Sequence, residues 1–429
     1  MSNARSFGFE TRMLHAGQIP DPHVGARAVP IYQTTSYVFG SADEAAHLFE
    51  LKQYGNIYSR ISNPTNAVFE ERMASLEGGT GALAVASGMA AEFSTIMTLC
   101  SPGDHIVSSN QLYGGTMTMF AHTLKKLGVD VTFVNPSDTA DWEAAIQPKT
   151  RAMFVETIGN PVNSIPDLEG LGALSKSAGV PLIVDSTFAT PYLCRPIEWG
   201  ATIVVHSATK FIGGHGTSIG GVVVDSGDFD FSQNPSIADP SPAYHGMRFF
   251  DTFGHYGFLV KLRAETIRDI GACISPTNSF QLLQGLETLS LRMDRHVQNA
   301  LAVAKYLEAH PRVSKVHYAG LESHPHFDRA KKYLPKGPGA VMSFEISPSS
   351  GDVRLAGKTF IESLQLFSHL ANVGDAKSLV IHPASTTHQQ LSDEELLAGG
   401  ITAGMIRLSV GLETIDDLLW DLDQAFARI

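Results

Sequence analysis

A lysine stands where an apolar segment meets a glycine-rich one, in the stretch VVHSATKFIGGHG at residues 204–216. Lys210 follows ATIVVH, a run typical of a buried strand, and the hydroxyls of Ser207 and Thr209 flank it. An amine just beyond a buried strand is partly desolvated, which lowers its pKa and makes the neutral, nucleophilic form accessible. These residues favour phosphate-binding hydroxyls beside an amine that forms a Schiff base. The alternative is a surface cation whose aliphatic chain lies along apolar surface.

A carboxylate closes the apolar run VPLIVD at Asp185. An aspartate in this position could bind magnesium in a nucleotide hydrolase. No GxxxxGK[ST] loop accompanies it, however, because GGHGTSIGG has no lysine. A protonated heterocyclic nitrogen is a cationic partner that suits a buried carboxylate, since the two form a charge-assisted hydrogen bond.

Three further segments place polar groups at the ends of apolar runs. ALAVAS leads through Ser87, Gly88 and Met89 into a helical pattern, where free backbone N–H groups and the helix dipole favour a phosphate. The alternative there is a simple tight turn. Asn160 follows RAMFVET and could reach a ligand oxygen, and Tyr113 precedes two glycines and could stack on an aromatic ring. Taken alone, each of these last two is typical of a structural residue.

The elements that must position these side chains alternate regularly from residue 82 onward. Short apolar runs alternate with amphipathic stretches, which predicts right-handed crossovers and an α/β fold with a mostly parallel sheet flanked by helices. In such a sheet the strands' carboxyl ends meet at one edge, so the polar residues that close them lie together. The predicted strands are ALAVAS, DHIVSS, VDVTFV, RAMFVET, VPLIVD, ATIVVH and IGGVVV.

The segments on either side of this pattern are organised differently. Residues 1–77 predict an extended N-terminal arm with one helix near residues 41–51, and residues 227–246 predict a loop insertion. Beyond a helical stretch that ends near Gly271, a long helical pattern over residues 278–310, the strands GAVMSFEI, SLVIHP and MIRLSV, and a last helix capped by Thr414 and Asp417 predict a smaller α+β domain. The expected units are therefore residues 1–77, 78–271 and 272–429.

Composition excludes several classes of protein. The 429 residues carry a formal charge of −12, and their 31 basic residues form no long run, so a nucleic-acid partner is not expected. No segment is apolar for long enough to span a bilayer, and no signal-peptide pattern opens the chain, which predicts no membrane association and a cytoplasmic location. The histidines of SHPHF and HPASTTH lack acidic or thiol partners at ligand spacing, so no metal site is expected. Three scattered thiols are predicted to be core residues: Cys100, Cys194 and Cys273.

The segments ASGMAA, YGGT, ETIGNP, VDSTFATP and HSATKFIGGH, in this order and spacing, resemble the Cys/Met-metabolism enzymes that use pyridoxal 5'-phosphate, over nearly the whole chain. The resemblance implies a PLP-dependent transferase fold of type I, in which Lys210 holds the cofactor covalently, Asp185 pairs with the pyridine nitrogen and Tyr113 stacks on the ring. The further cofactor contacts it implies are Ser87, Gly88, Met89, Ser207 and Thr209 at the phosphate and Asn160 near the ring hydroxyl.

The resemblance also implies how substrate and subunits come together. Tyr58 and Arg60, in YSRISNPT, match residues that reach the phosphate site of the neighbouring subunit, which implies at least a dimer and, for the family, a homotetramer built from dimers. Arg407 matches the arginine that binds the substrate α-carboxylate, a role that suits its bidentate geometry. Asn160, Asn372 and Ser378 are also assigned to the substrate site. That Tyr113 or Tyr58 assists proton transfer is a hypothesis.

Three segments resemble the O-acetylhomoserine sulfhydrylases: NVGDAKSLVIHPASTTHQQL, the insertion before AYHGMRFFDTFG, and LLQGLETLSLRMDRH. The implied reaction exchanges the acetate of O-acetylhomoserine for sulfide or a thiol and yields, with sulfide, homocysteine for methionine biosynthesis. O-succinylhomoserine sulfhydrylase, cystathionine γ-synthase and methionine γ-lyase remain alternatives. Cystathionine enzymes, however, tend to carry SLGGxES at residues 372–378, and methionine γ-lyases carry a cysteine at the position of Gly115. An alternative of another class is a non-catalytic nucleotide-binding protein in which Lys210 only contacts a phosphate.

Overall fold

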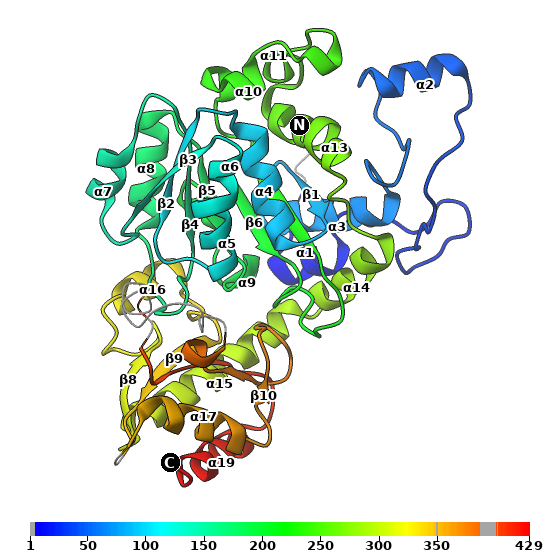
Figure 1. Ribbon diagram of the computed structural model, residues 1–429. Coiled ribbons are helices and arrows are strands. Elements are labelled where there is room, and N and C mark those ends of the chain that lie inside the picture. Colours follow the sequence, from blue (N-terminus) through cyan, green and yellow to red (C-terminus); the bar gives the residue numbers. More distant parts are fainter. Residues whose placement is uncertain (1–4, 349–350, 387–399, 401) are drawn as a thin grey trace.

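The computed structural model describes residues 5–348, 351–386, 400 and 402–429. Two sheets organise this part of the chain (Figure 1). The larger has seven strands in the order β1-β7-β6-β5-β4-β2-β3, and the smaller has five in the order β10-β11-β12-β9-β8. None of the described helices combines the length and the apolar character needed to cross a bilayer.

The large sheet contains all seven predicted strands. Its strands pair in parallel except for β7, which runs antiparallel to both β1 and β6. Most of these strands are buried, as the continuous apolar runs predicted. Their bounds are β1 Gly81–Val85, β2 His105–Ser109, β3 Asp130–Val134, β4 Thr150–Glu156, β5 Leu182–Asp185, β6 Ile203–Ser207 and β7 Gly221–Asp225.

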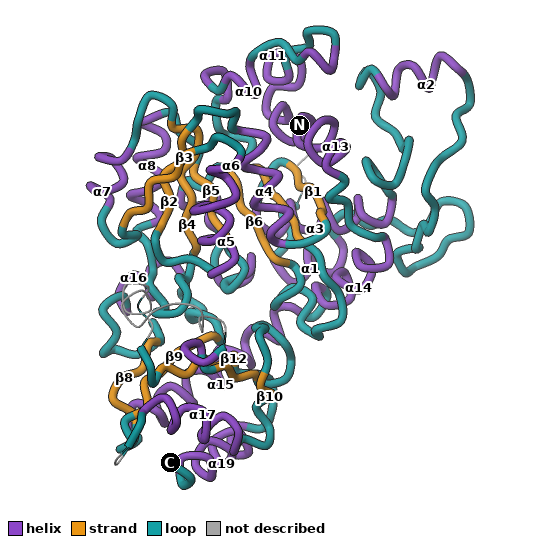
Figure 2. Tube along the Cα trace, viewed as in Figure 1, coloured by secondary structure: helices purple, strands orange, loops and turns teal. Residues whose placement is uncertain are grey.

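Successive residues of these strands alternate between two hydrophobic cores, one on each face of the sheet. Val205 and Val223 belong to the core beneath α4 (Gly88–Leu99), whereas Val204 and Val222 belong to the core that includes α3 (Pro64–Glu77) and α8 (Leu168–Ala178). Figure 2 shows helices on both sides of the strands. The shorter helical elements around this sheet are α5 Gly114–Thr118, α6 Leu124–Lys126, α7 Thr139–Ala145, α9 Thr190–Leu193, α10 Pro235–Ala238, α11 Phe249–Phe253, α12 Gly257–Lys261 and α13 Arg268–Ile270.

The N-terminal arm differs in part from the prediction. The expected helix is present as α2 (Ala42–Phe49), which stands apart from the rest of the molecule in Figure 1, but α1 (Phe9–His15) and α3 also form. Helix α3 packs against β1 and β7. Its sequence showed no amphipathic period because it is buried on several sides, polar residues included. Arg72, fully buried, bonds the backbone oxygen of Ala16 and pairs with Glu287 at 3.2 Å.

The C-terminal unit forms around the five-stranded sheet. The single long helix predicted over residues 278–310 is two helices, α14 (Pro276–Leu286) and α15 (Leu289–Ala309). The predicted capping box is wrong, because the Thr414 side chain makes no capping hydrogen bond to α19. Strands β8 and β10 were not predicted. The bounds are β8 Val313–His317, α16 Phe327–Tyr333, β9 Val341–Ile346, α17 Val353–Ser363, β10 Ser368–His369, β11 Leu379–Ile381, β12 Met405–Ser409 and α19 Ile415–Phe426.

Candidate active site

A cavity of about 250 Å³ lies at the carboxyl ends of β4, β5 and β6. Residues 371–373 and Arg407 of the C-terminal unit form another part of its wall, so both sheets contribute to it. The cavity brings together most of the residues that the sequence singled out: Ser87, Gly88, Met89, Tyr113, Asn160, Asp185, Ser207, Thr209, Lys210, Asn372 and Arg407.

One end of the cavity is formed by the N-terminus of α4. Ser87 caps this helix, because its hydroxyl accepts a hydrogen bond of 3.1 Å from the Ala90 amide. A Cβ at Gly88 would lie 2.6 Å from the Cβ of Ser207, so only glycine lets the helix approach the end of β6 this closely. The first amides of a helix have no acceptor within it, and the helix dipole adds positive potential there. With the Ser207 hydroxyl, this end has the donors that a phosphate requires.

Asp185 ends β5 and faces the cavity from a partly buried position. Its Oδ1 accepts two hydrogen bonds from Thr187, one of 2.8 Å from the amide and one of 2.5 Å from the hydroxyl. Burial raises the pKa of Asp185, and the two Thr187 bonds oppose this rise. Since hydrogen bonds to a carboxylate favour its charged form, Thr187 both orients Asp185 and stabilises its anion.

Lys210 follows β6, and its amine donates a hydrogen bond to Oδ1 of Asn372. Burial lowers the pKa of Lys210, and the positive charge of Arg407 lowers it further. This is the direction that the position of the lysine in the sequence predicted. Arg407 itself lies on β12, where burial lowers its pKa to about 10. An amine and a guanidinium therefore face one cavity from different sheets.

The structure adds three residues to the site that the sequence analysis did not assign to it. Glu92 lies on α4, Glu156 closes β4 and accepts a 2.6 Å hydrogen bond from the Tyr113 amide, and Thr187 supports Asp185. A signal for Glu92 was present in the sequence, because it is the only acidic residue in the otherwise uncharged helix GMAAEFSTIMTL. Burial raises the pKa values of Glu92 and Glu156 well above the ordinary value.

Ser378 does not line this cavity, and its assignment to the substrate site stays a prediction. It is fully buried, and its hydroxyl donates to Oε2 of Glu413 at 2.9 Å. The Ser378 hydroxyl oxygen also accepts a hydrogen bond of 2.8 Å from the Gly411 amide. These bonds give Ser378 the role of fixing the turn after β12.

Tyr58 and Arg60 also lie outside the cavity within one chain. Arg60 bonds the backbone oxygen of Arg268, and its guanidinium carbon lies 5.3 Å from the centroid of the Tyr58 ring. The Tyr58 side chain is 40% exposed. Their assignment to a neighbouring subunit's site therefore stays a prediction.

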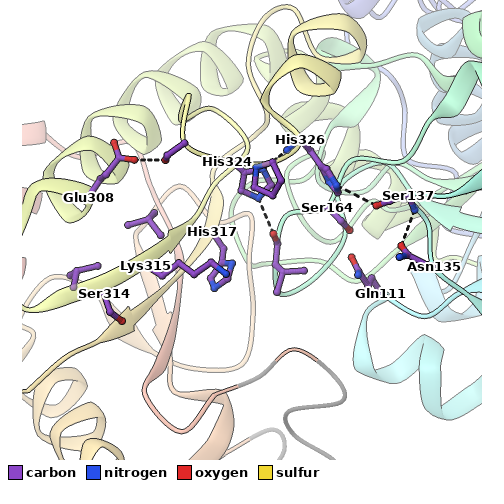
Figure 3. A pocket seen from close by; sticks show the side chains of 15 residues that line it. Gln111, Asn135, Ser137, Ser164, Glu308, Ser314, Lys315, His317, His324 and His326 are labelled. Carbon is purple, nitrogen blue, oxygen red and sulfur yellow. Dashed lines mark hydrogen bonds between the residues drawn. The ribbon is translucent and has the colours of Figure 1, made fainter.

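A second cavity, of about 520 Å³, lies beside β8 and contains the histidines of SHPHF (Figure 3). His324 Nε2 bonds the backbone oxygen of Val162 at 3.2 Å, and its Nδ1 accepts from the His326 amide. His326 Nδ1 accepts from the Ile165 amide, and its Nε2 bonds the Ser137 hydroxyl. Both nitrogens of each ring are thus engaged within the protein, and no cluster of metal-ligating side chains occurs among the described residues. Of the three thiols, Cys100 and Cys194 are buried and Cys273 is partly exposed.

The residues of the first cavity fit pyridoxal phosphate. The cofactor's phosphate, ring nitrogen and aldehyde require, respectively, a cluster of hydrogen-bond donors, an anion and an amine with a lowered pKa. The end of α4, Asp185 and Lys210 supply these three groups around one space. A Cβ at Gly88 would fill part of the phosphate end.

Comparison with known proteins agrees with this arrangement. A homocysteine synthase from Schizosaccharomyces pombe is 53% identical over 422 residues, covering 97% of each chain, and an O-acetyl-L-homoserine sulfhydrylase from Leptospira meyeri is 49% identical, covering 100% of this chain and 98% of the relative. A crystal structure described as an O-acetylhomoserine (thiol)-lyase from Campylobacter jejuni, which carries a pyridoxyl-lysine phosphate, superposes with a TM-score of 0.94 at 41% identity and covers 98% of this chain and 100% of that one. The family of Cys/Met metabolism PLP-dependent enzymes matches residues 10–427, and the chain belongs to this family.

Proposed function

We propose that the chain catalyses a γ-replacement in which O-acetylhomoserine and hydrogen sulfide give homocysteine and acetate. The observation that carries this proposal is the convergence of Lys210, Asp185 and Arg407 on one cavity, in a chain whose relatives are O-acetylhomoserine sulfhydrylases and homocysteine synthases along its full length. Because the family is enzymatic, a non-catalytic nucleotide-binding role is set aside.

The cofactor site would be formed by Lys210, Asp185, Tyr113, Asn160 and the end of α4. Pyridoxal phosphate, when bound there, supplies an aldehyde for amine condensation and a ring that withdraws electrons from the bond to Cα. Asp185 would hold the ring nitrogen protonated through a charge-assisted hydrogen bond, and its two bonds from Thr187 favour the ionised carboxylate that this pairing needs. The helix terminus and the Ser207 hydroxyl bind the phosphate.

The substrate would be oriented from the C-terminal unit. Arg407 binds the α-carboxylate through its two terminal nitrogens, and burial in the cavity wall strengthens this charge pairing. Lys210 removes the proton from Cα and transfers protons at Cβ, which allows acetate to leave from Cγ. Its lowered pKa means that the neutral, proton-accepting amine is available closer to neutral pH. Sulfide then adds at Cγ, and the amine returns one proton to Cβ and one to Cα.

Steady-state kinetics with a panel of substrates tests the proposal. O-acetylhomoserine and O-succinylhomoserine are each offered with sulfide, cysteine or methanethiol, and L-methionine is offered alone. We expect the highest kcat/KM for O-acetylhomoserine with sulfide, and turnover at least about 10³-fold lower in Lys210→Ala. A preference for O-succinylhomoserine, for cysteine as acceptor, or for cleavage of methionine would instead support one of the related activities.

The exposed N-terminal arm supports a proposal about assembly. Two chains form a dimer with two active sites, and Tyr58 and Arg60 of each chain reach the phosphate site of the other. Apolar side chains are strongly exposed along this arm, and Val38 is fully exposed. Such exposure in one region marks a surface that another chain covers. We further propose that two such dimers form a homotetramer. We also propose that the chain divides into three units at residues 77 and 271, and that the protein is cytoplasmic. Other exposed apolar residues of the arm are Ile19, Val24, Phe49 and Tyr54.

A further inference from the structure

Glu92 is a buried acid that the proposed reaction does not use. It lies in the middle of α4, is 3% exposed and lines the cavity together with Asp185. An uncompensated carboxylate in such a place is costly, so its presence needs a physical account.

The surroundings of Glu92 are acidic. Glu92, Asp185 and Glu156 line the same cavity, and besides burial, the charge of Asp185, the charge of Glu156 and a side-chain hydrogen bond to Asp185 raise the pKa of Glu92. The Thr116 hydroxyl, on α5, lies 3.1 Å from one carboxyl oxygen of Glu92 and 2.9 Å from the other. Three carboxyl groups therefore line one cavity, whose cationic lining groups are Lys210 and Arg407.

Two carboxyl groups can form a hydrogen bond with each other only if one of them carries a proton. Asp185 accepts two hydrogen bonds from Thr187, and the nearby His206 lowers its pKa further. Glu92 has one hydroxyl contact, and burial together with Asp185 raises its pKa well above the ordinary value. The balance of contacts assigns the proton to Glu92 and the charge to Asp185.

We propose that Glu92 is a positioning residue for the cofactor, a neutral carboxylic acid that donates a hydrogen bond to Asp185 and holds it ionised and correctly oriented toward the ring nitrogen. This inference rests on the proposed function only in that the cofactor is pyridoxal phosphate. It is independent of which homoserine ester or thiol the enzyme uses.

The affinity of Glu92 variants for the cofactor shows whether the site needs a neutral hydrogen-bond donor or a negative charge at position 92. Glu92→Gln keeps the shape, the neutrality and an N–H donor, and we expect its dissociation constant for pyridoxal phosphate to stay within about threefold of the wild-type value. Glu92→Leu removes the donor, and the loss of about 1–3 kcal/mol that follows from unpairing a buried polar group corresponds to a dissociation constant roughly 10- to 100-fold higher. Both are measured by titrating apoenzyme and following the cofactor's absorbance, without substrate.

Infrared spectroscopy locates the proton directly. Apoenzyme labelled with ¹³C at glutamate carboxyl groups should show the C=O stretch of a protonated carboxyl near neutral pH, and this band should be lost or reduced in Glu92→Gln. Glu308→Gln serves as the matched control, because Glu308 is exposed and lines the second cavity rather than the one that contains Asp185. This variant should leave the band unchanged.

Each other outcome overturns the inference. If Glu92→Gln weakens cofactor binding as much as Glu92→Leu, the site needs a charge rather than a neutral donor. If Glu92→Leu binds the cofactor like the wild type, Glu92 does not position Asp185. If the protonated band is unchanged in Glu92→Gln, the proton lies on another acid. Failure of the proposed function would appear differently, as normal cofactor binding without turnover of O-acetylhomoserine.

Discussion

The amine of Lys210 donates a hydrogen bond to the side-chain oxygen of Asn372, and this bond joins the end of β6 to the C-terminal unit. Asn372 is neutral, so it orients the amine without the strong stabilisation of the ammonium form that a carboxylate would provide. Burial and Arg407 can then keep the pKa of Lys210 low. A neutral acceptor at this position is therefore part of what makes the amine reactive.

Asn372→Asp should raise the pKa of Lys210, because an anion in hydrogen-bond contact favours the ammonium form. Condensation with the cofactor needs the neutral amine, so the pH at which apoenzyme incorporates pyridoxal phosphate at half-maximal rate should move upward by about 1 unit or more. Stopped-flow absorbance over a range of pH measures this. Ser368→Asp, which adds the same charge at an exposed position of β10, four residues before Asn372, should leave the midpoint in place. An unchanged midpoint in Asn372→Asp would contradict the role of the contact.

Gly88→Ala should weaken cofactor binding by roughly tenfold or more, because a single misplaced buried contact costs on the order of 1–3 kcal/mol. The added methyl would lie 2.6 Å from the Cβ and 2.9 Å from the Cα of Ser207, and separating them widens the phosphate end of the cavity. Equilibrium titration of apoenzyme with the cofactor checks this. The matched control is Gly8→Ala, whose nearest heavy atom would be 3.9 Å away and which should bind normally.

Asp225 gives the protein a pH-dependent stability. Burial raises its pKa from 3.8 to about 7, and its Oδ2 is buried without a partner among the described residues. The folded protein therefore holds the Asp225 proton more tightly than the unfolded chain does. The stability that this protonated carboxyl group contributes is fully present below about pH 3.8 and is lost as pH rises through about 7. Its upper bound is about 4 kcal/mol.

Asp225→Asn should remove this contribution's pH dependence. Compared with the wild type, the variant should gain in thermal midpoint between pH 5 and pH 8, as measured by calorimetry of the apoenzyme in matched buffers. Asp228→Asn, a change at a neighbouring exposed carboxylate, is the control and should follow the wild type. A constant difference between Asp225→Asn and the wild type over this range would show that Asp225 does not titrate there.

Val38→Asp should dissociate the proposed assembly, since it places a charge on a fully exposed apolar side chain of the arm. Sedimentation velocity should show a smaller species, with loss of activity at low protein concentration. Leu355→Asp, at a 61% exposed apolar position of α17, should leave the assembly intact. If Val38→Asp sediments like the wild type, the arm does not form the contact.

The large sheet and most of its site were predictable from the sequence because both follow from local pattern. Fully buried strands appear as apolar runs, and parallel strands bring their closing residues to one edge, so the sequence alone groups Asp185, Lys210 and Asn160. Glu92 could not be placed in this way, because it comes from the middle of a helix rather than from a strand end. Arg407 and Asn372 were assigned by resemblance alone, because the local sequence pattern does not predict how the second sheet packs against the first. Ser378 was assigned by the same route, and in the structure its hydroxyl bonds Glu413 and Gly411.

The hydrogen bond between Lys210 and Asn372 spans 162 positions of the chain, and Arg407 follows later still. A ribosome consequently completes the pocket in a fixed order, with the end of α4, Asp185 and the lysine emerging well before the groups that recognise the substrate. The groups of the large sheet that face the cavity are therefore synthesised before Asn372 and Arg407, which complete its wall.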